Sequence, residues 1–218
     1  MRDPVVSLHR RLTRARRLFA YAGPDAQDAL ALEALAPLNG SFLPWTVFSM
    51  RPSAILCILT DIVVNSRSQI VECGSGNSTV FMGRLLASHG ATQVQVHSLE
   101  HDIRWAEVTR QALKRESLDS FVSVVTAPLV NGWYDWRAVP PLDDIDLLVV
   151  DGPPAHEQSL FNARAPALTH FGSALRDGAT VFLDDAERDG ERQVIAQWER
   201  EHGLQFHQQR GSWAVATR

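Results

Sequence analysis

From residue 68 onward, short apolar segments alternate with longer amphipathic ones, and glycine, proline or aspartate marks most of the changes. Apolar segments of this length are typical of buried strands, and the amphipathic segments are typical of helices. The pattern predicts strands at 69–73, 92–99, 121–126, 145–150 and 179–183, helices at 78–89, 103–115, 157–175 and 188–202, and a closing hairpin at 204–208 and 213–216. This alternation favours an α/β fold: a doubly wound, mostly parallel seven-stranded sheet with helices on both faces.

The first part of the chain lacks this alternation. Apolar spacing predicts helices at 5–20, at 25–36 and from residue 52 to about 65, with a loop at 41–51. We therefore divide the chain into an N-terminal helical appendage with a covering loop, residues 1–50, and an α/β domain, residues 51–218. The first helix carries an arginine-rich face, which we interpret as solvated; docking on an acidic surface or a membrane is the alternative.

The charge and cysteine counts limit the partners and the compartment that we expect. The 218 residues include 21 basic and 25 acidic side chains, and the net charge of −4 argues against nucleic acid as the main partner. Two cysteines are too few for a disulfide scaffold and fit a reducing cytoplasm. The sequence shows no secretory signal at residues 1–11 and no run of about 18 apolar residues to span a membrane. We expect a cytoplasmic protein, and the sequence does not indicate its oligomeric state.

Ligands of doubly wound sheets bind beyond the carboxyl ends of the strands, so the residues that follow each strand form the candidate site. The first strand contains Glu72 and runs into a Gly-Ser-Gly turn at 74–76, where glycine permits a close approach to a ligand. A dinucleotide fingerprint would have a third glycine in place of Thr79, and Glu72 would repel a pyrophosphate. An acid before the turn favours a ligand with an ammonium or sulfonium group. Glu100, at the end of the second strand, would accept both hydroxyls of a ribose.

Four segments carry a resemblance to a known family: Val71-Glu72-Cys73-Gly74-Ser75-Gly76-Asn77-Ser78-Thr79, Leu99-Glu100-His101-Asp102, Thr126-Ala127-Pro128-Leu129 and Leu147-Leu148-Val149-Val150-Asp151-Gly152. Residues 69 to about 185 resemble a class I S-adenosylmethionine (SAM)-dependent methyltransferase (EC 2.1.1.-), similar to small catechol and macrocin O-methyltransferases. The resemblance implies that the glycine turn holds the methionine part of SAM and Glu100 its ribose. The residues it places at the cofactor are Ser49, Met50, Glu72, Gly74, Ser75, Gly76, Asn77, Ser78, Glu100, His101, Thr126, Ala127 and Asp151.

The chain departs from the family's pattern beside the adenine. Members usually carry an acidic or amide side chain after the third strand, whereas this chain has Ala127-Pro128. We therefore expect backbone groups to recognise the adenine. The segment 44–50 precedes the glycine turn at a spacing similar to that of the cofactor-covering loop of small O-methyltransferases, which is why Ser49 and Met50 are included.

Three aspartates follow neighbouring strands: Asp151 comes after the fourth strand, and Asp184 with Asp185 after the fifth. Adjacent strands lie about 4.8 Å apart, so these carboxylates are expected to converge. At about 5 Å they repel by roughly 3 kcal/mol per pair, and a divalent cation, a shared proton or a turned side chain would relieve this. The resemblance to Mg²⁺-dependent O-methyltransferases implies that the three aspartates bind Mg²⁺, which would orient and acidify an acceptor hydroxyl. Alternatively, Asp184 or Asp185 caps the next helix.

The general base is a second departure. Catechol-type enzymes carry a lysine shortly after the first aspartate, whereas this chain has Pro153-Pro154, and its one lysine, Lys114, lies on the second crossover helix. His156 is the first candidate for the catalytic base, because histidine titrates close to neutral pH. Asp151 is the second candidate if no metal binds. The alternative for His156 is a surface position at the start of a helix.

Aromatic residues in two loops are candidates for the wall of an acceptor pocket, although each is more often a core residue: Trp45, Phe48, Trp133, Tyr134 and Trp136. The chain has no basic aromatic stripe for RNA, so the expected acceptor is a small molecule or a sugar. The sequence thus predicts a SAM-dependent methyltransferase that acts on a hydroxyl. Two alternatives stay open: a non-catalytic nucleotide-binding protein of this fold, and a NAD-dependent oxidoreductase, which Glu72 and Thr79 disfavour.

Overall fold

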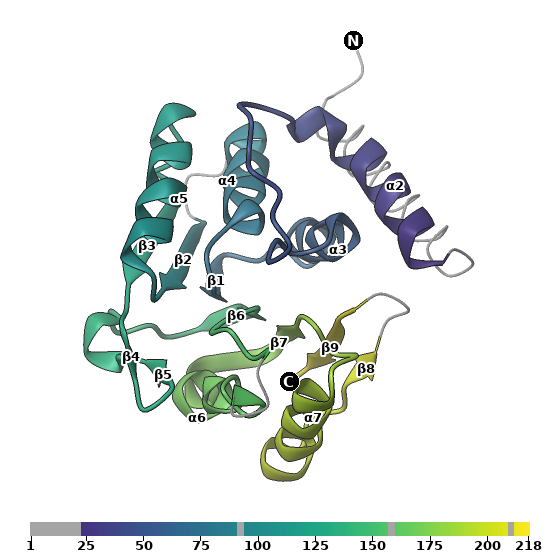
Figure 1. Cartoon of the computed structure of the whole chain (residues 1–218), viewed down its shortest axis with the longest axis vertical. Coiled ribbons are helices and arrows are strands. Elements are labelled where there is room, and N and C mark those ends of the chain that lie inside the picture. Colours follow the sequence, from purple (N-terminus) through teal and green to yellow (C-terminus); the bar gives the residue numbers. More distant parts are fainter. Residues whose placement is uncertain (1–22, 91–93, 157–159, 209–211) are drawn as a thin grey trace.

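The computed structural model of the chain describes residues 23–90, 94–156, 160–208 and 212–218, and Figure 1 shows its helices and strands. The helices are α2 (Pro24–Leu35), α3 (Pro52–Val64), α4 (Asn77–His89), α5 (Ile103–Arg115), α6 (Pro166–Phe171) and α7 (Asp189–His202), with 3-10 turns η1 (Ala36–Leu38), η2 (Trp136–Ala138) and η4 (Gly172–Ala174). The strands are β1 (Gln69–Cys73), β2 (Gln95–Glu100), β3 (Val122–Thr126), β4 (Leu129–Val130), β5 (Trp133–Tyr134), β6 (Ile145–Val150), β7 (Leu175–Leu183), β8 (His207–Gln208) and β9 (Ala214–Thr217). Within the described ranges, no helix combines the length and the apolar character that crossing a membrane requires.

Seven strands form one sheet in the order β3-β2-β1-β6-β7-β9-β8. The first five run parallel to one another, and β9 is antiparallel to both of its neighbours. The predicted doubly wound, mostly parallel seven-stranded sheet is therefore confirmed. The strand order reverses between β1 and β6, which lie side by side, and this switch point is where such sheets bind ligands.

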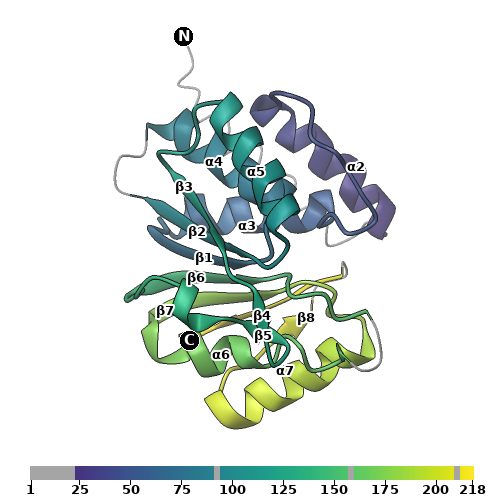
Figure 2. The same cartoon turned by 60° about the vertical axis from the view of Figure 1, so that its left-hand side comes forward.

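Each face of the sheet has its own core, because alternate residues of a strand point to opposite faces. One face is covered by α3, α4 and α5, which pack with side chains such as Ile70 and Leu147. The other face is covered by α6 and α7, which pack with side chains such as Val71 and Leu148. Figure 2 shows the sheet between the two helical layers. With both faces covered, a ligand reaches the sheet at the carboxyl ends of its strands.

The described N-terminal part is joined to the first helical layer. Ala31 of α2 and Ile55 of α3 belong to the same buried core, and Arg51 Nη2 forms an ion pair with Asp28 Oδ2 at 2.7 Å. The predicted helices at 25–36 and 52–65 are confirmed, with boundaries shifted by about one residue. The predicted helix at 5–20 lies outside the described residues. The division of the chain at residue 50 stays a prediction.

The structure corrects the segment between β6 and β7. Residues 157–159 of the predicted helix at 157–175 lie outside the described residues. Over 160–175 the prediction is wrong: residues 161–165 are turns, α6 has six residues, and β7 begins at Leu175. Pro166 has no N–H for a helical hydrogen bond and its ring clashes with the preceding turn, so it begins a helix instead of continuing one. As a result, Arg164 lies in a turn beside the strand ends.

The loop that carries the aromatic residues Trp133, Tyr134 and Trp136 includes a short hairpin, in which β4 pairs with β5. Asn131 and Gly132 form its turn, with φ angles of 54° and 82°. Positive φ at both turn residues is what a two-residue type I′ hairpin requires, and Asn-Gly is its usual sequence. The hairpin brings Tyr134 back opposite Leu129, close to the end of β3.

Candidate active site

A cavity of about 460 Å³ opens at the carboxyl ends of β1, β2, β6 and β7, within the usual size range of ligand sites. Most of the residues that the sequence predicts for the site line it: Ser49, Met50, Gly74, Ser75, Gly76, Asn77, Ser78, Glu100, His101, Asp151, His156, Asp184 and Asp185. Three predicted cofactor contacts, Glu72, Thr126 and Ala127, do not line it. The strand ends therefore meet at one cavity, as predicted, although not every side chain faces it.

The turn between β1 and α4 is held very close to the end of β6. Gly74 has a φ of 97°, a backbone conformation that residues with a side chain rarely adopt. A Cβ atom added to Gly74 would lie 3.0 Å from the backbone N of Gly152. Asn77 and Ser78, the first residues of α4, line the cavity. The N-terminus of α4 therefore offers a positive end to a carboxylate in the cavity.

Glu72 is fully buried beneath this turn. Its carboxylate accepts hydrogen bonds from Ser78 Oγ at 2.6 Å, Thr79 Oγ1 at 2.5 Å and Ser98 Oγ at 2.6 Å. Burial raises the pKa of Glu72 to about 7, although the three hydroxyl groups act in the opposite direction. The prediction that Glu72 meets a positively charged ligand directly is corrected, because its side chain bonds the first turn of α4 instead.

Glu100 lies at the wall of the cavity and is 3% exposed. Its Oε2 accepts from the backbone N and the Oγ of Ser75 at 3.1 and 3.0 Å, and its Oε1 accepts from the backbone N of Asp102 at 2.9 Å. The Nδ1 atom of His101 is 3.0 Å from Oε1. Burial by itself raises the pKa of Glu100, but these hydrogen bonds outweigh burial and lower it. Glu100 is therefore ionised, with its carboxylate at the cavity.

Thr126 and Ala127, at the end of β3, do not line the cavity, and their predicted contact with the adenine stays a prediction. Thr126 Oγ1 accepts from Arg110 Nη2 at 2.5 Å, and Ala127 is fully buried. Trp105 of α5 lines the cavity instead, and its Nε1 donates to the carbonyl of Ser75 at 2.7 Å. Sequence analysis missed Trp105, although its position in the first turn of the helix that follows β2 indicates a place near the strand ends.

The loop before α3 covers the cavity. Ser49 and Thr46 close a tight turn, in which Thr46 N donates to Ser49 Oγ at 2.9 Å, and the buried side chain of Met50 anchors the loop in the core. Phe48 is 76% exposed, and its ring centroid lies 5.9 Å from that of His156. The predicted base and one predicted aromatic residue thus lie together at the mouth of the cavity.

The other aromatic residues divide between the cavity and the rest of the fold. Within the described residues, Tyr134 joins Phe48 in lining the cavity. Trp45 packs against Phe81 of α4, and the ring of Trp133 is stacked on His170 of α6. Trp136 is 65% exposed and does not line the cavity. The alternative of a packing or surface role therefore applies to the three tryptophans.

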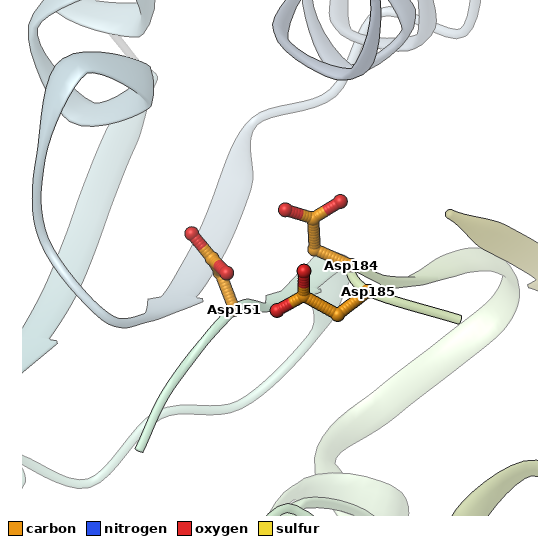
Figure 3. Close-up of side chains that lie close together, drawn as sticks. All are labelled: Asp151, Asp184 and Asp185. Carbon is orange, nitrogen blue, oxygen red and sulfur yellow. The ribbon is translucent and has the colours of Figure 1, made fainter. Parts of the chain in front are cut away.

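Figure 3 shows that Asp151, Asp184 and Asp185 converge at the ends of β6 and β7. One carboxylate oxygen from each lies within 4.8 Å of the others. Burial raises the pKa of Asp151 to about 6, with Arg164 acting against it. Burial and the two neighbouring aspartates raise the pKa of Asp184 well above its usual value. The predicted convergence is observed, and the repulsion that it creates has to be relieved.

Sequence analysis missed the residue that relieves this repulsion, Arg164. Its side chain is 3% exposed and lines the cavity from the turn before α6. Nη2 lies 3.1 Å from Asp185 Oδ2 and 3.6 Å from Asp151 Oδ1, and Nη1 lies 3.4 Å from Glu191 Oε1. A second guanidinium, Arg188, contacts Asp185 Oδ2 at 2.7 Å from a partly exposed position.

The order of the sheet strands, with one cavity at the switch point, defines a class I SAM-dependent methyltransferase fold. The family described as "Methyltransferase domain" matches residues 71–186, and the chain belongs to this family. No curated protein sequence matches the chain. The matched region runs from β1 to the residue after the aspartate pair, so it includes most of the cavity wall.

Several solved structures share the fold. An O-methyltransferase from Bacillus cereus, in complex with S-adenosylhomocysteine (SAH), has a TM-score of 0.61 at 18% identity, covering 94% of this chain and 97% of that chain. The SAH-bound methyltransferase PaMTH1 from Podospora anserina has a TM-score of 0.59 at 11% identity, covering 95% and 87%. A methyltransferase from Geobacter sulfurreducens has a TM-score of 0.56 at 15% identity, covering 99% and 88%. At these identities, the similarity shows the fold alone.

Proposed function

We propose that the protein transfers the methyl group of SAM to a hydroxyl group of a small molecule or a sugar. The observation that carries the proposal is the single cavity in which Glu100, the glycine turn, the acidic strand ends and His156 meet. The O-methyltransferase from Bacillus cereus, which has this fold and was solved with SAH, supports the cofactor and the acceptor atom.

The cofactor is proposed to extend from Glu100 to Asp151. Glu100 accepts the ribose hydroxyls, which replace the contacts that its carboxylate makes with Ser75 Oγ and the His101 ring. The methionine carboxylate lies at the N-terminus of α4, and Met50 with Ser49 covers the cofactor from the loop. The positive sulfonium then lies in the cavity between Glu100 and Asp151, and the ionised Glu100 carboxylate favours a cationic ligand.

The resemblance to catechol and macrocin O-methyltransferases implies Mg²⁺ at Asp151, Asp184 and Asp185, but the residues around these carboxylates do not fit a metal. Asp185 Oδ2 is already bound by two guanidinium groups, those of Arg164 and Arg188. Two unit charges about 4 Å apart repel by about 4 kcal/mol at an effective dielectric constant near 20, so a guanidinium at that distance would oppose a divalent cation by about twice this amount.

The proposed reaction therefore uses side chains of the chain alone. The acceptor oxygen attacks the methyl carbon in line with the sulfur, so an O–CH₃ bond forms as the S–CH₃ bond breaks and the sulfonium becomes a neutral thioether. His156 at the mouth of the cavity accepts the proton of the hydroxyl group, and Phe48 holds the acceptor against it. In-line positioning contributes most of the rate enhancement.

Methyl transfer from isotopically labelled SAM to a panel of catechols, phenols and simple sugars tests the proposal, with the product identified by mass spectrometry. A methylated hydroxyl supports it. Methylation confined to an amine or thiol would refute the acceptor class. SAH binding without turnover of any acceptor would favour the non-catalytic alternative.

A further inference from the structure

Arg164 joins the two loops that follow β6 and β7. Its Nε donates to the carbonyl of Pro153 at 3.3 Å and its Nη2 donates to the carbonyl of Asp151, both after β6. Its Nη1 donates to the carbonyl of Asp184 at 3.0 Å, after β7. One planar group thus fixes the backbone at both strand ends, in addition to its contact with the Asp185 carboxylate.

All three nitrogens of this guanidinium are engaged by the fold. Five oxygens lie around them within 3.4 Å: three backbone carbonyls, Asp185 Oδ2 and Glu191 Oε1. Four of these contacts are hydrogen bonds and the contact with Glu191 is an ion pair at 3.4 Å, so most of the five N–H groups of the guanidinium are directed at protein atoms. Arg164 is a positioning residue and not a catalytic one.

We infer that Arg164 takes the place of the divalent cation in this methyltransferase: its fixed guanidinium neutralises and positions Asp151 and Asp185, and methyl transfer needs no metal. The part of the inference that concerns methyl transfer rests on the proposed function. The part that concerns the replacement of the divalent cation by Arg164 rests on the geometry alone. A divalent cation at this site would be held by the carboxylates of Asp151, Asp184 and Asp185, and Arg164 links the two loops that carry them.

A specific consequence follows for variants. Removing the guanidinium leaves three convergent aspartates with one remaining cation, Arg188, whose side chain is 41% exposed. Oxygen-rich sites of this kind suit Mg²⁺ or Mn²⁺. Arg164→Ala should therefore gain a response to these ions that the wild-type protein lacks.

The test is thermal unfolding of the wild-type protein and of Arg164→Ala, Arg164→Lys and Arg188→Met, with EDTA or with millimolar Mg²⁺ or Mn²⁺. The Tm of the wild-type protein should be the same in all conditions. Arg164→Ala should have a lower Tm, which rises by about 5–10 °C once the ion is about a hundredfold above its Kd. Arg164→Lys keeps a buried cation and Arg188→Met keeps Arg164, so neither should respond.

The inference would be overturned if Mg²⁺ raises the Tm of the wild-type protein and the Asp184→Asn substitution abolishes that rise. A folded Arg164→Ala variant that ignores both ions would also overturn it. If Arg164→Ala does not fold, calorimetric titration of wild-type protein with Mg²⁺ decides: no heat supports the inference, and saturable binding overturns it. Failure of the wild-type protein to bind SAH would refute the proposed function separately, because the Tm responses do not depend on cofactor.

Discussion

Glu72→Gln is expected to stabilise the protein above neutral pH and to change its stability little below about pH 4.5. The pKa of Glu72 rises from its usual value of 4.5 to about 7 in the folded protein. The folded state therefore holds this proton more tightly than the unfolded chain. The free energy of unfolding is highest below the unfolded-state pKa and falls as the pH rises through 7.

The difference between 4.5 and about 7 corresponds to about 3 kcal/mol. Glutamine has the shape of the protonated carboxyl group and does not ionise, so the variant avoids this loss. Above about pH 8 it should be more stable by about 3 kcal/mol, which raises Tm by about 6–12 °C in a protein of this size. SAH affinity should be retained, because Glu72 does not line the cavity.

Urea unfolding of both proteins between about pH 4 and pH 8.5 measures the difference directly. Glu107→Gln is the control, since it makes the same chemical change at a side chain that is 56% exposed. A constant difference between wild type and Glu72→Gln across this range would refute the reasoning. A variant that becomes less stable as the pH rises would refute it as well.

Three further variants test the site. Glu100→Gln should weaken SAH binding about 10- to 150-fold in calorimetry, because ribose loses a charged acceptor, and unchanged affinity would contradict the ribose assignment. Gly152→Ala should lower Tm because its Cβ would lie 2.4 Å from Tyr134 Oη; adding Tyr134→Phe should restore part of the loss, and strictly additive effects would argue against this contact. His156→Ala should lower kcat about 10²- to 10⁴-fold with SAH affinity unchanged, whereas an unaltered pH–rate profile would exclude it as the base.

The sheet and most of the cavity wall could be predicted from the sequence because each signal is local. Apolar runs, glycine turns and a polar residue after each strand show where β1, β2, β6 and β7 end, and parallel topology brings those ends together. For this reason the sequence predicts Glu100 and Asp151 at the strand ends, and both line the cavity.

The burial of Glu72 could have been predicted from the alternation of side chains along the strand as well as from its position near the strand end. Side chains alternate along β1, so Ile70 and Glu72 share the face that α4 covers, while Val71 and Cys73 face the other way. The same alternation, applied to the acid before the turn, predicts a buried residue beneath α4. Its three hydroxyl partners come from residues up to 26 positions away, which local patterns do not reveal.

Arg164 could not be predicted from local signals because a helix was expected across its position. On a regular helix its side chain would have no fixed relation to Asp185, 21 residues further on. Pro166 is the local sign that the helix begins later. The cation itself could have been anticipated from the three aspartates, since their repulsion requires a positive partner, but composition does not say which arginine supplies it.

Calorimetric titration of the wild-type protein with SAH, with NAD⁺ as the comparison, most directly tests whether the cavity at the strand ends is a SAM site. We expect saturable SAH binding at one site, with a Kd roughly in the micromolar range, and no heat with NAD⁺. Absence of SAH binding by the folded protein, or binding of NAD⁺ in its place, would contradict the central claim.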